Sequence, residues 1–397
     1  MKNIIKILIV ILFFTLSINI CYAEEVDIYS ESTNTLESEI STDELYKAKV
    51  TKVGGIFENE YKYQEVTVEM LDGPTKGESY DIKYTLKVLD TAELEPLELG
   101  EKVYVIFAEG PNGTYIPSIS DVYRLPYLIF ITILFLLLII VIGKFQGLKT
   151  VISLVVTILG IFCIMIPAIM NGASAAVSSI ITCTIIAIIT FVLISGFKRK
   201  TLVAILGTMF GVLVAGVLSS VVASLGHITG LADCEAHMLV YVSQSMTIDI
   251  DGMLFAGILI GTVGATMDVA MSIASSMTEV LDKVPNISIK ELIKSGMNVG
   301  KDAMGTMSNT LIFAYVGESL ILIILLMNTG ASFNEIVNSD QIATEIVRGL
   351  ASTIGMISAI PLTTLVFGFI QKYFPKKKSR IEQMVEENIE RNVKTIK

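Results

Sequence analysis

The sequence predicts an α-helical polytopic membrane protein, with about seven transmembrane helices after an N-terminal signal sequence and a small extracytoplasmic all-β module. Three observations predict this class. The chain has 397 residues, of which 52% are hydrophobic and only 17% are charged, whereas soluble domains usually carry about 25% charged residues. The apolar residues gather in runs long enough to cross a bilayer core. One polar region ahead of these runs instead alternates with the period of two that is typical of strands.

Residues 1–23 have two interpretations, a signal peptide or a first transmembrane helix. Lys2 and Lys6 frame the start of an apolar segment that runs to Ile20, and a small-residue cleavage pattern ends at Ala23. Both interpretations export the residues that follow. Residues 24–45 are acidic and poor in apolar side chains, and this composition predicts a disordered leader.

Residues 46–125 are predicted to form the extracytoplasmic β module. Five segments alternate apolar and polar residues: "KAKVTKV", "QEVTVEML", "ESYDIKYTL", "EKVYVIFAE" and "TYIPSISDVYR". Turn sequences such as Asp72-Gly73-Pro74 and Pro111-Asn112-Gly113 separate several of them. Five short strands in this length favour a small barrel of the OB type.

Residues 126–370 are predicted to form a transmembrane domain of seven helices, followed by a basic cytoplasmic tail at 371–397. The expected spans are 126–143, 148–170, 174–195, 201–225, 253–275, 305–327 and 343–370. Alternate loops contain clusters of lysine and arginine, while the loops 171–173, 226–252 and 328–342 contain neither. The positive-inside rule then places every basic loop and the C-terminus in the cytoplasm, with the β module outside.

The fifth predicted span carries one ionisable residue, Asp268. Residues three, four and seven apart share a helix face, so Asp268 lies on one stripe with the packing candidates Gly257, Gly261 and Gly264. Small residues allow helices to approach closely in a membrane. We therefore expect Asp268 to face the interior of the bundle, where an ionisable group marks an ion or proton path. A carboxylate that is simply hydrogen-bonded to a neighbouring helix is the alternative.

The sixth predicted span adds a second polar stripe, Asp302, Thr306 and Asn309. At 1.5 Å of rise per residue, Asp268 and Asn309 are predicted to lie within about one turn of each other in depth. These four polar residues are the candidates for binding a coupling ion or substrate. Glu318 and Arg348, on the sixth and seventh spans, are expected to form an intramembrane ion pair.

Other kinds of site are weakly indicated. His227, Cys234 and His237 lie in one loop, but their spacing matches no metal-site template, and no nucleotide or cofactor motif is present. We expect neither metal nor cofactor, nor enzymatic activity, although Asp268 and Asp302 could form an acidic dyad. The net charge of −10 gives no indication of nucleic-acid binding.

The segments "GATMDVAMSIAS" and "SGMNVGKDAMGTMSNTLIFAY" resemble the YibE/YibF family of multi-span bacterial membrane proteins. The resemblance covers residues 130–370 best and draws attention to Gly264, Asp268, Asp302, Asn309 and Tyr315. It implies a protein of the bacterial cytoplasmic membrane and implies no particular activity.

Two functions remain open from the sequence. The first is an ion-coupled secondary transporter, or permease, of a small solute, in which Asp268 carries the coupling ion while Thr306 and Asn309 orient it. The alternative is an envelope scaffold or sensor whose β module binds a partner. The expected partners are the lipid bilayer, a small solute or ion, and a second copy of the chain or an envelope protein.

Overall fold

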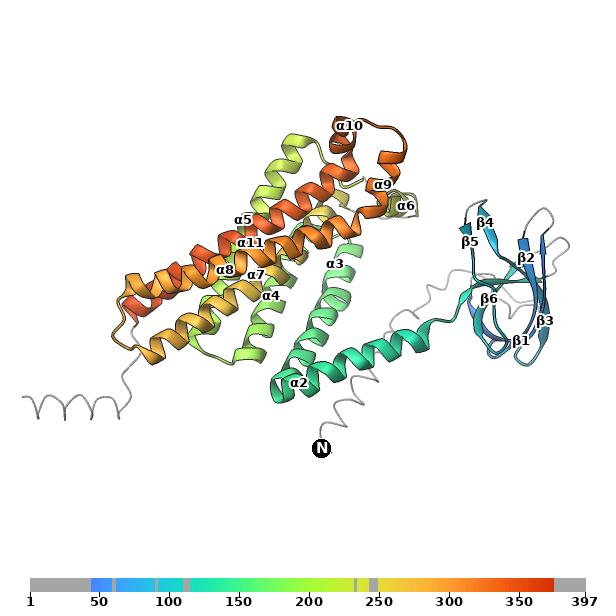
Figure 1. The fold of residues 1–397 in the computed structure, drawn as a ribbon, viewed down its shortest axis with the longest axis horizontal. Helices are drawn as coiled ribbons and strands as arrows, with labels where there is room; N and C mark the ends of the chain where they lie inside the picture. The colour runs from blue at the N-terminus through green and yellow to red at the C-terminus, as the bar shows by residue number, and fades with distance from the viewer. Residues whose placement is uncertain are drawn as a thin grey trace, which may run out of the picture. The chain divides into compact units, whose positions relative to one another are not determined.

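The computed structural model describes residues 44–58, 62–89, 92–109, 115–231, 234–242 and 249–374. The chain divides between Thr132 and Ile133 into two compact units, a β unit and a helical unit (Figure 1). The predicted signal segment 1–23, nearly all of the acidic leader and most of the basic tail lie outside the described residues.

The β unit contains all five predicted strands, together with a small extra hairpin. Its strands are β1 (Tyr46–Glu58), β2 (Lys62–Met70), β3 (Ser79–Thr85), β4 (Lys87–Leu89), β5 (Ala92–Glu93), β6 (Lys102–Glu109) and β7 (Tyr115–Val122). Five of them form an antiparallel sheet in the order β3-β2-β1-β6-β7. The edge strands β3 and β7 contact each other, so the sheet curls toward a barrel.

Alternate side chains of these strands form the core of the β unit. Val50, Val68 and Val105 are completely buried, as the period-two pattern requires. The ring of Phe107 packs edge-on against Tyr46 at 5.8 Å and Tyr80 at 5.7 Å between ring centroids. Burial of this apolar face supplies the main favourable term for folding of the unit.

The helical unit contains most of a long helical stretch, α2 (Leu125–Leu159), η3 (Gly160–Met165) and α3 (Ile166–Met170). Lys144 interrupts α2 with φ of 50° and ψ of −124°. Gly147 then lies against the carbonyl oxygen of Ile139, although these residues would be about 12 Å apart in a straight helix. The chain thus turns sharply at Lys144, between the segments predicted as the first two spans.

Four longer helices follow: α4 (Ala175–Ser195), α5 (Arg199–Gly226), α7 (Ile250–Lys283) and α11 (Asp340–Tyr373). The helices α8 (Ile289–Glu318) and α9 (Leu320–Asn328) form a pair bent by 55°. Two short helices lie between longer ones: α6 (Cys234–Val242) between α5 and α7, and α10 (Phe333–Asn338) between α9 and α11. Among the described residues, five helical stretches are long and apolar enough to cross a membrane, or six if the bent pair is one span. The sequence predicted seven spans, because residues 126–143 and 148–170 of the stretch 125–170 were counted as separate spans.

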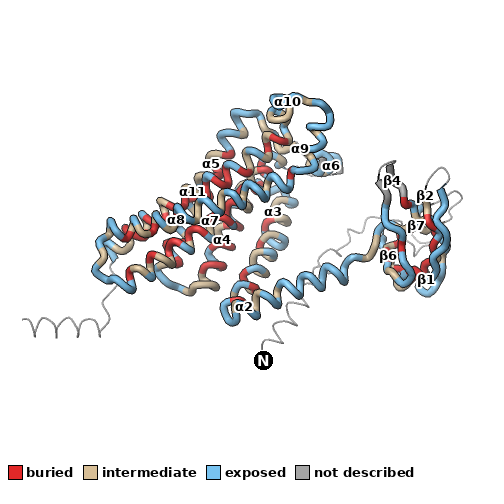
Figure 2. The backbone as a smooth tube through the Cα atoms, in the orientation of Figure 1, coloured by how far each residue is buried: buried red, intermediate tan, exposed pale blue. Residues whose placement is uncertain are grey.

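The helical unit is built around α5, α7 and α11, where buried residues concentrate (Figure 2). A Cβ atom on Gly211 of α5 would lie 2.7 Å from the carbonyl oxygen of Gly355 on α11. Buried hydroxyls add to the contact, since the hydroxyl of Thr262 on α7 lies 2.7 Å from the carbonyl oxygen of Ile258 and 3.0 Å from the hydroxyl of Ser352 on α11, within hydrogen-bond distance of both. Close approach through small residues is the packing mode of membrane helices.

Candidate functional site

Asp268 lies on the outer surface of the helical unit. The opposite face of α7 is fully buried at Val269, Ile273 and Met277, which belong to a core shared with α4, α5, α8 and α11. Gly264, Asp268 and Ser272 are exposed. The expectation that Asp268 faces the interior of the bundle is therefore wrong for a single chain. The larger apolar side chains of α7 occupy the core, and the small and polar stripe remains uncovered.

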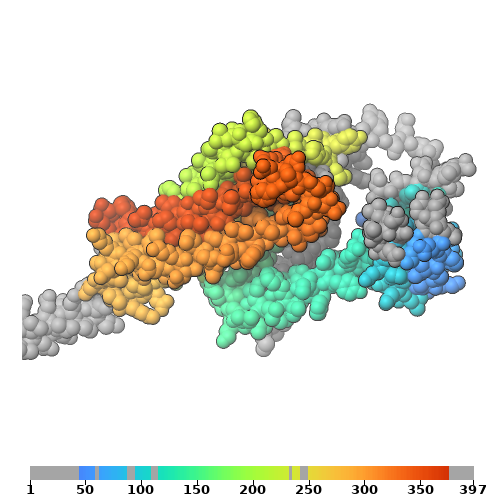
Figure 3. Space-filling view, turned by 45° about the horizontal axis from the view of Figure 1, so that its top comes forward, coloured from blue at the N-terminus to red at the C-terminus, as the bar shows by residue number. Residues whose placement is uncertain are grey.

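The three polar candidates on α8 are exposed as well. Asp302, Thr306 and Asn309 point away from the core, because α8 packs through Leu292, Gly296 and Gly300. Thr306 donates its hydroxyl to the carbonyl oxygen of Ala303 at 3.1 Å within its own helix. Figure 3 shows α8, in orange, lying along the surface of the helical unit.

The packing of α7 against α8 fixes the relative depth of these residues. Gly300 of α8 lies against Ile273 of α7, and Tyr315 lies against Gly261, so the two helices run antiparallel. In this register Asp268 is level with residue 305, and Asn309 lies about one turn farther along α8. The polar residues of α7 and α8 thus share one depth, but no hydrogen bond or ion pair joins Asp268 to Asp302, Thr306 or Asn309.

Only one of the three predicted packing glycines contacts a neighbouring helix. A Cβ on Gly261 would lie 2.7 Å from the hydroxyl oxygen of Tyr315, whereas Gly257 and Gly264 face open space. The stripe is consequently a contact surface at Gly261 and an open surface on either side of it.

Arg348 has a different partner from the one predicted. It forms an ion pair with Glu345, three residues earlier on α11, and the two side chains are 21% and 13% exposed. Glu318 is exposed and forms no ion pair among the described residues. The expected Glu318–Arg348 pair is replaced by an i,i+3 pair within one helix, a spacing at which side chains are neighbours. The sequence carried that signal in Glu345 and Arg348.

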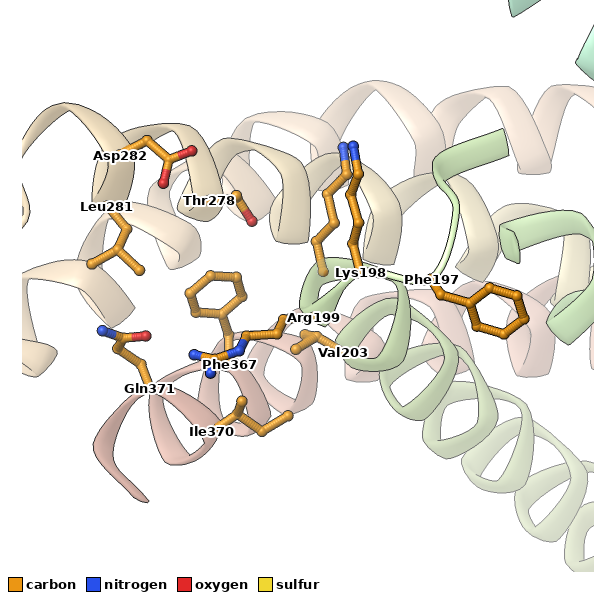
Figure 4. A pocket seen from close by; sticks show the side chains of 11 residues that line it. Phe197, Lys198, Arg199, Val203, Thr278, Leu281, Asp282, Phe367, Ile370 and Gln371 are labelled. Atoms are coloured by element: carbon orange, nitrogen blue, oxygen red, sulfur yellow. The ribbon is translucent and has the colours of Figure 1, made fainter. Parts of the chain in front are cut away.

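A cavity of about 650 Å³ lies at the end of the helical unit where α5 begins and where α7 and α11 end. We refer to this end as the basic end, because Lys198, Arg199 and Lys200 line the cavity. Thr278 and Asp282 contribute from α7 (Figure 4). Sequence reasoning used the three consecutive basic residues only to orient the spans and did not foresee this cavity.

A second cavity, of about 600 Å³, lies at the opposite end of the same helices. Its polar lining includes Ser219 and Ser224 from α5, His227 after that helix, and Asp249 and Asp251 at the start of α7. Asp249 caps α7 by accepting the N–H of Gly252 at 2.9 Å. The two cavities therefore lie at the two ends of α5 and α7, one lined by cations and the other by carboxylates and hydroxyls.

A family model for YibE/F-like proteins matches residues 131–373, which is more than half of the chain. The chain belongs to the YibE/F-like family. The matched region begins just before the helical unit and includes both cavities and the polar residues of α7 and α8. No curated protein and no solved structure matches the chain.

Family membership and the apolar helices together make this YibE/F-like chain a membrane protein. The strands of the β unit lie before the matched region. Among the described residues of the YibE/F-like chain, no three His, Cys, Asp or Glu side chains are grouped to hold a metal ion. The polar groups of the α7–α8 surface are the carboxylates of Asp268 and Asp302, the amide of Asn309 and the hydroxyl of Thr306.

Proposed function

We propose that this YibE/F-like protein is an ion-coupled secondary transporter of a small solute, and that Asp268 binds the coupling proton or cation. One observation carries the proposal. The Asp268 carboxylate lies in the apolar part of a 34-residue helix, and no described residue gives it a hydrogen bond or an ion pair. A charge at such a depth is costly unless it is neutralised, so a bound proton or cation is the simplest compensation.

The surroundings of Asp268 support the same proposal. Thr306 and Asn309 offer oxygen atoms at nearly the same depth on α8, as a weak cation site needs. The cavities of about 650 and 600 Å³ give the α5–α7 pair a polar opening at each end. Both openings include residues of α7, the helix that carries Asp268.

The test is ion flux in proteoliposomes that contain a pH-sensitive or sodium-sensitive dye. We expect the wild-type protein to dissipate an imposed proton or sodium gradient and Asp268→Asn to lose this flux. Glu279→Gln is the matched control, because Glu279 lies on the same helix, is exposed and pairs with Lys283 at the basic end. Wild-type flux in a well-folded Asp268→Asn protein would sink the proposal.

The β unit supports a second candidate function, a scaffold or sensor in the envelope. Its face formed by β1, β2 and β3 has a cavity of about 310 Å³ lined by Lys52, Glu65, Asp81 and Lys83. Such alternating charges could bind a polar partner. In this case Asp268→Asn preserves function and deletion of residues 24–120 abolishes it; the transporter hypothesis predicts that Asp268→Asn abolishes it.

A further inference from the structure

The cavity at the basic end has an excess of positive charge. Lys198, Arg199 and Lys200 contribute three cations and Asp282 contributes one carboxylate, so the lining carries a net charge of about +2. The first turn of α5 also begins here without a side-chain cap, and the free N–H groups of a helix N-terminus add partial positive charge. The electrostatics favour an anionic ligand.

The three cations have different roles. Arg199 donates to the carbonyl oxygen of Phe374 at 2.5 Å, so it ties the end of α11 to the start of α5. Within the described part of the chain, the ammonium group of Lys200 makes one hydrogen bond, to the hydroxyl of Ser275 at 3.3 Å. Lys198 makes no hydrogen bond through its ammonium group to any residue that the structure describes. An ammonium group has three donors, and the two lysines therefore keep most of theirs for a ligand.

The cavity also has an apolar part, beside the polar side chains of Thr278 and Gln371. Val203, Leu281, Phe367 and Ile370 line it beside the cations, and Phe367 lies between α5 and α7 in Figure 4. Phe197 precedes the basic residues, points away from them and is 93% exposed. An exposed aromatic ring beside cations, where apolar helices end, matches the headgroup region of a bilayer. The ligand that fits this lining has an anionic head and apolar chains.

We propose that the cavity at the basic end binds the phosphate group of an anionic phospholipid, with Lys198 and Lys200 as the phosphate-binding residues and Arg199 as a positioning residue. Basic pockets between transmembrane helices bind lipid headgroups by this chemistry. Inorganic phosphate would satisfy the lysines but would leave the apolar lining unused. The site does not include Asp268 and does not depend on a transport function.

The proposal is tested with the full chain purified in detergent and reconstituted in phosphatidylcholine nanodiscs with or without phosphatidylglycerol. We expect phosphatidylglycerol to raise the melting temperature and to remain bound in native mass spectra. Because one basic residue near a membrane surface is worth about a fivefold change in affinity, Lys198→Gln/Lys200→Gln should bind this lipid about thirtyfold more weakly. Lys198→Arg/Lys200→Arg should restore binding.

Lys290→Gln/Lys294→Gln is the matched control, since it removes two exposed positive charges at the same end but outside the cavity. Equal losses in the two double glutamine variants would overturn the proposal in favour of general surface attraction. Stabilisation by inorganic phosphate alone, lost in Lys198→Gln/Lys200→Gln, would replace the lipid with a soluble phosphate. Unaltered lipid binding in a folded Lys198→Gln/Lys200→Gln protein would also overturn it.

Discussion

The hydroxyl of Tyr315 on α8 donates a hydrogen bond of 3.4 Å to the hydroxyl of Ser352 on α11. The same hydroxyl oxygen fills the space beside Gly261 on α7. One side chain thus joins three helices at the level where the open stripe of α7 is interrupted.

Gly261→Ala is expected to destabilise the helical unit. The added methyl group would lie 2.7 Å from the Tyr315 hydroxyl oxygen, and overpacking of this kind costs about 1–3 kcal/mol. In the double variant with Tyr315→Phe the loss should shrink, since the crowding oxygen is absent. Thermal unfolding in detergent measures both effects. Gly264→Ala is the control because Gly264 faces open space; an equal loss there would mean that another molecule covers the stripe.

Gly211→Ala should destabilise the protein more than Gly261→Ala. The nearest atom to the new methyl group would be the carbonyl oxygen of Gly355, at 2.7 Å, and a backbone atom on a packed helix cannot rotate away as a side chain can. We expect a loss at the upper end of the range for overpacking, about 3 kcal/mol. Gly305→Ala, at an open position of α8, should unfold at the wild-type temperature. A wild-type melting temperature for Gly211→Ala would contradict the close approach of α5 and α11.

Glu345→Gln and Glu318→Gln distinguish the observed ion pair from the predicted one. Glu345 is mostly buried and pairs with Arg348, while Glu318 is exposed. Weakening a partly buried charged contact costs about 1–3 kcal/mol, so Glu345→Gln should lower the unfolding temperature and Glu318→Gln should have little effect. The reverse order would restore the pairing of Arg348 with α8.

Ser288→Ala should weaken the first turn of α8 and change its response to pH. Ser288 donates its hydroxyl to the Glu291 carboxylate at 2.7 Å and accepts the N–H of Glu291 at 3.2 Å, as a capping box does. The hydrogen bonds from the side chain and backbone of Ser288 lower the pKa of Glu291. A carboxyl group with a lowered pKa stabilises the fold at pH values above its ordinary pKa. This contribution is lost as the pH falls through the lowered pKa.

Hydrogen exchange of the amides at the start of α8 measures this effect. Wild-type protection should fall on acidification, while Ser288→Ala should be weakly protected already at neutral pH and less sensitive to acid. Ser332→Ala removes the equivalent cap of α10 and should leave exchange in α8 unchanged. Identical pH profiles for wild type and Ser288→Ala would exclude the cap as the cause.

The strands and the helical periodicity could be predicted from the sequence because both depend on local patterns. All five predicted strand segments occur as β1, β2, β3, β6 and β7. The alignment of Gly264 and Asp268 on one face of α7 was also correct. A periodic pattern identifies which residues share a face, but the element that covers that face depends on packing between distant segments. For this reason the exposure of Asp268 could not be predicted.

The cavity at the basic end was beyond prediction for a related reason. Lys198, Arg199 and Lys200 are adjacent in sequence, but the cavity exists only because Thr278 and Phe367 arrive from two other helices. The partner of Arg348 could have been found, since Glu345 precedes it by three residues on the same helix. A carboxylate one turn away on the same helix is closer to Arg348 than one on another span.

The contact of Gly211 with Gly355 has a mechanical consequence. A Cβ atom added at Gly211 would lie only 2.7 Å from the carbonyl oxygen of Gly355, so the backbones of α5 and α11 approach closely here. Helices packed this closely cannot slide past each other without separating. This close approach opposes sliding of α5 along α11. Because α5 and α7 line both end cavities, a shift of α7 against the α5–α11 pair would change the two cavities together.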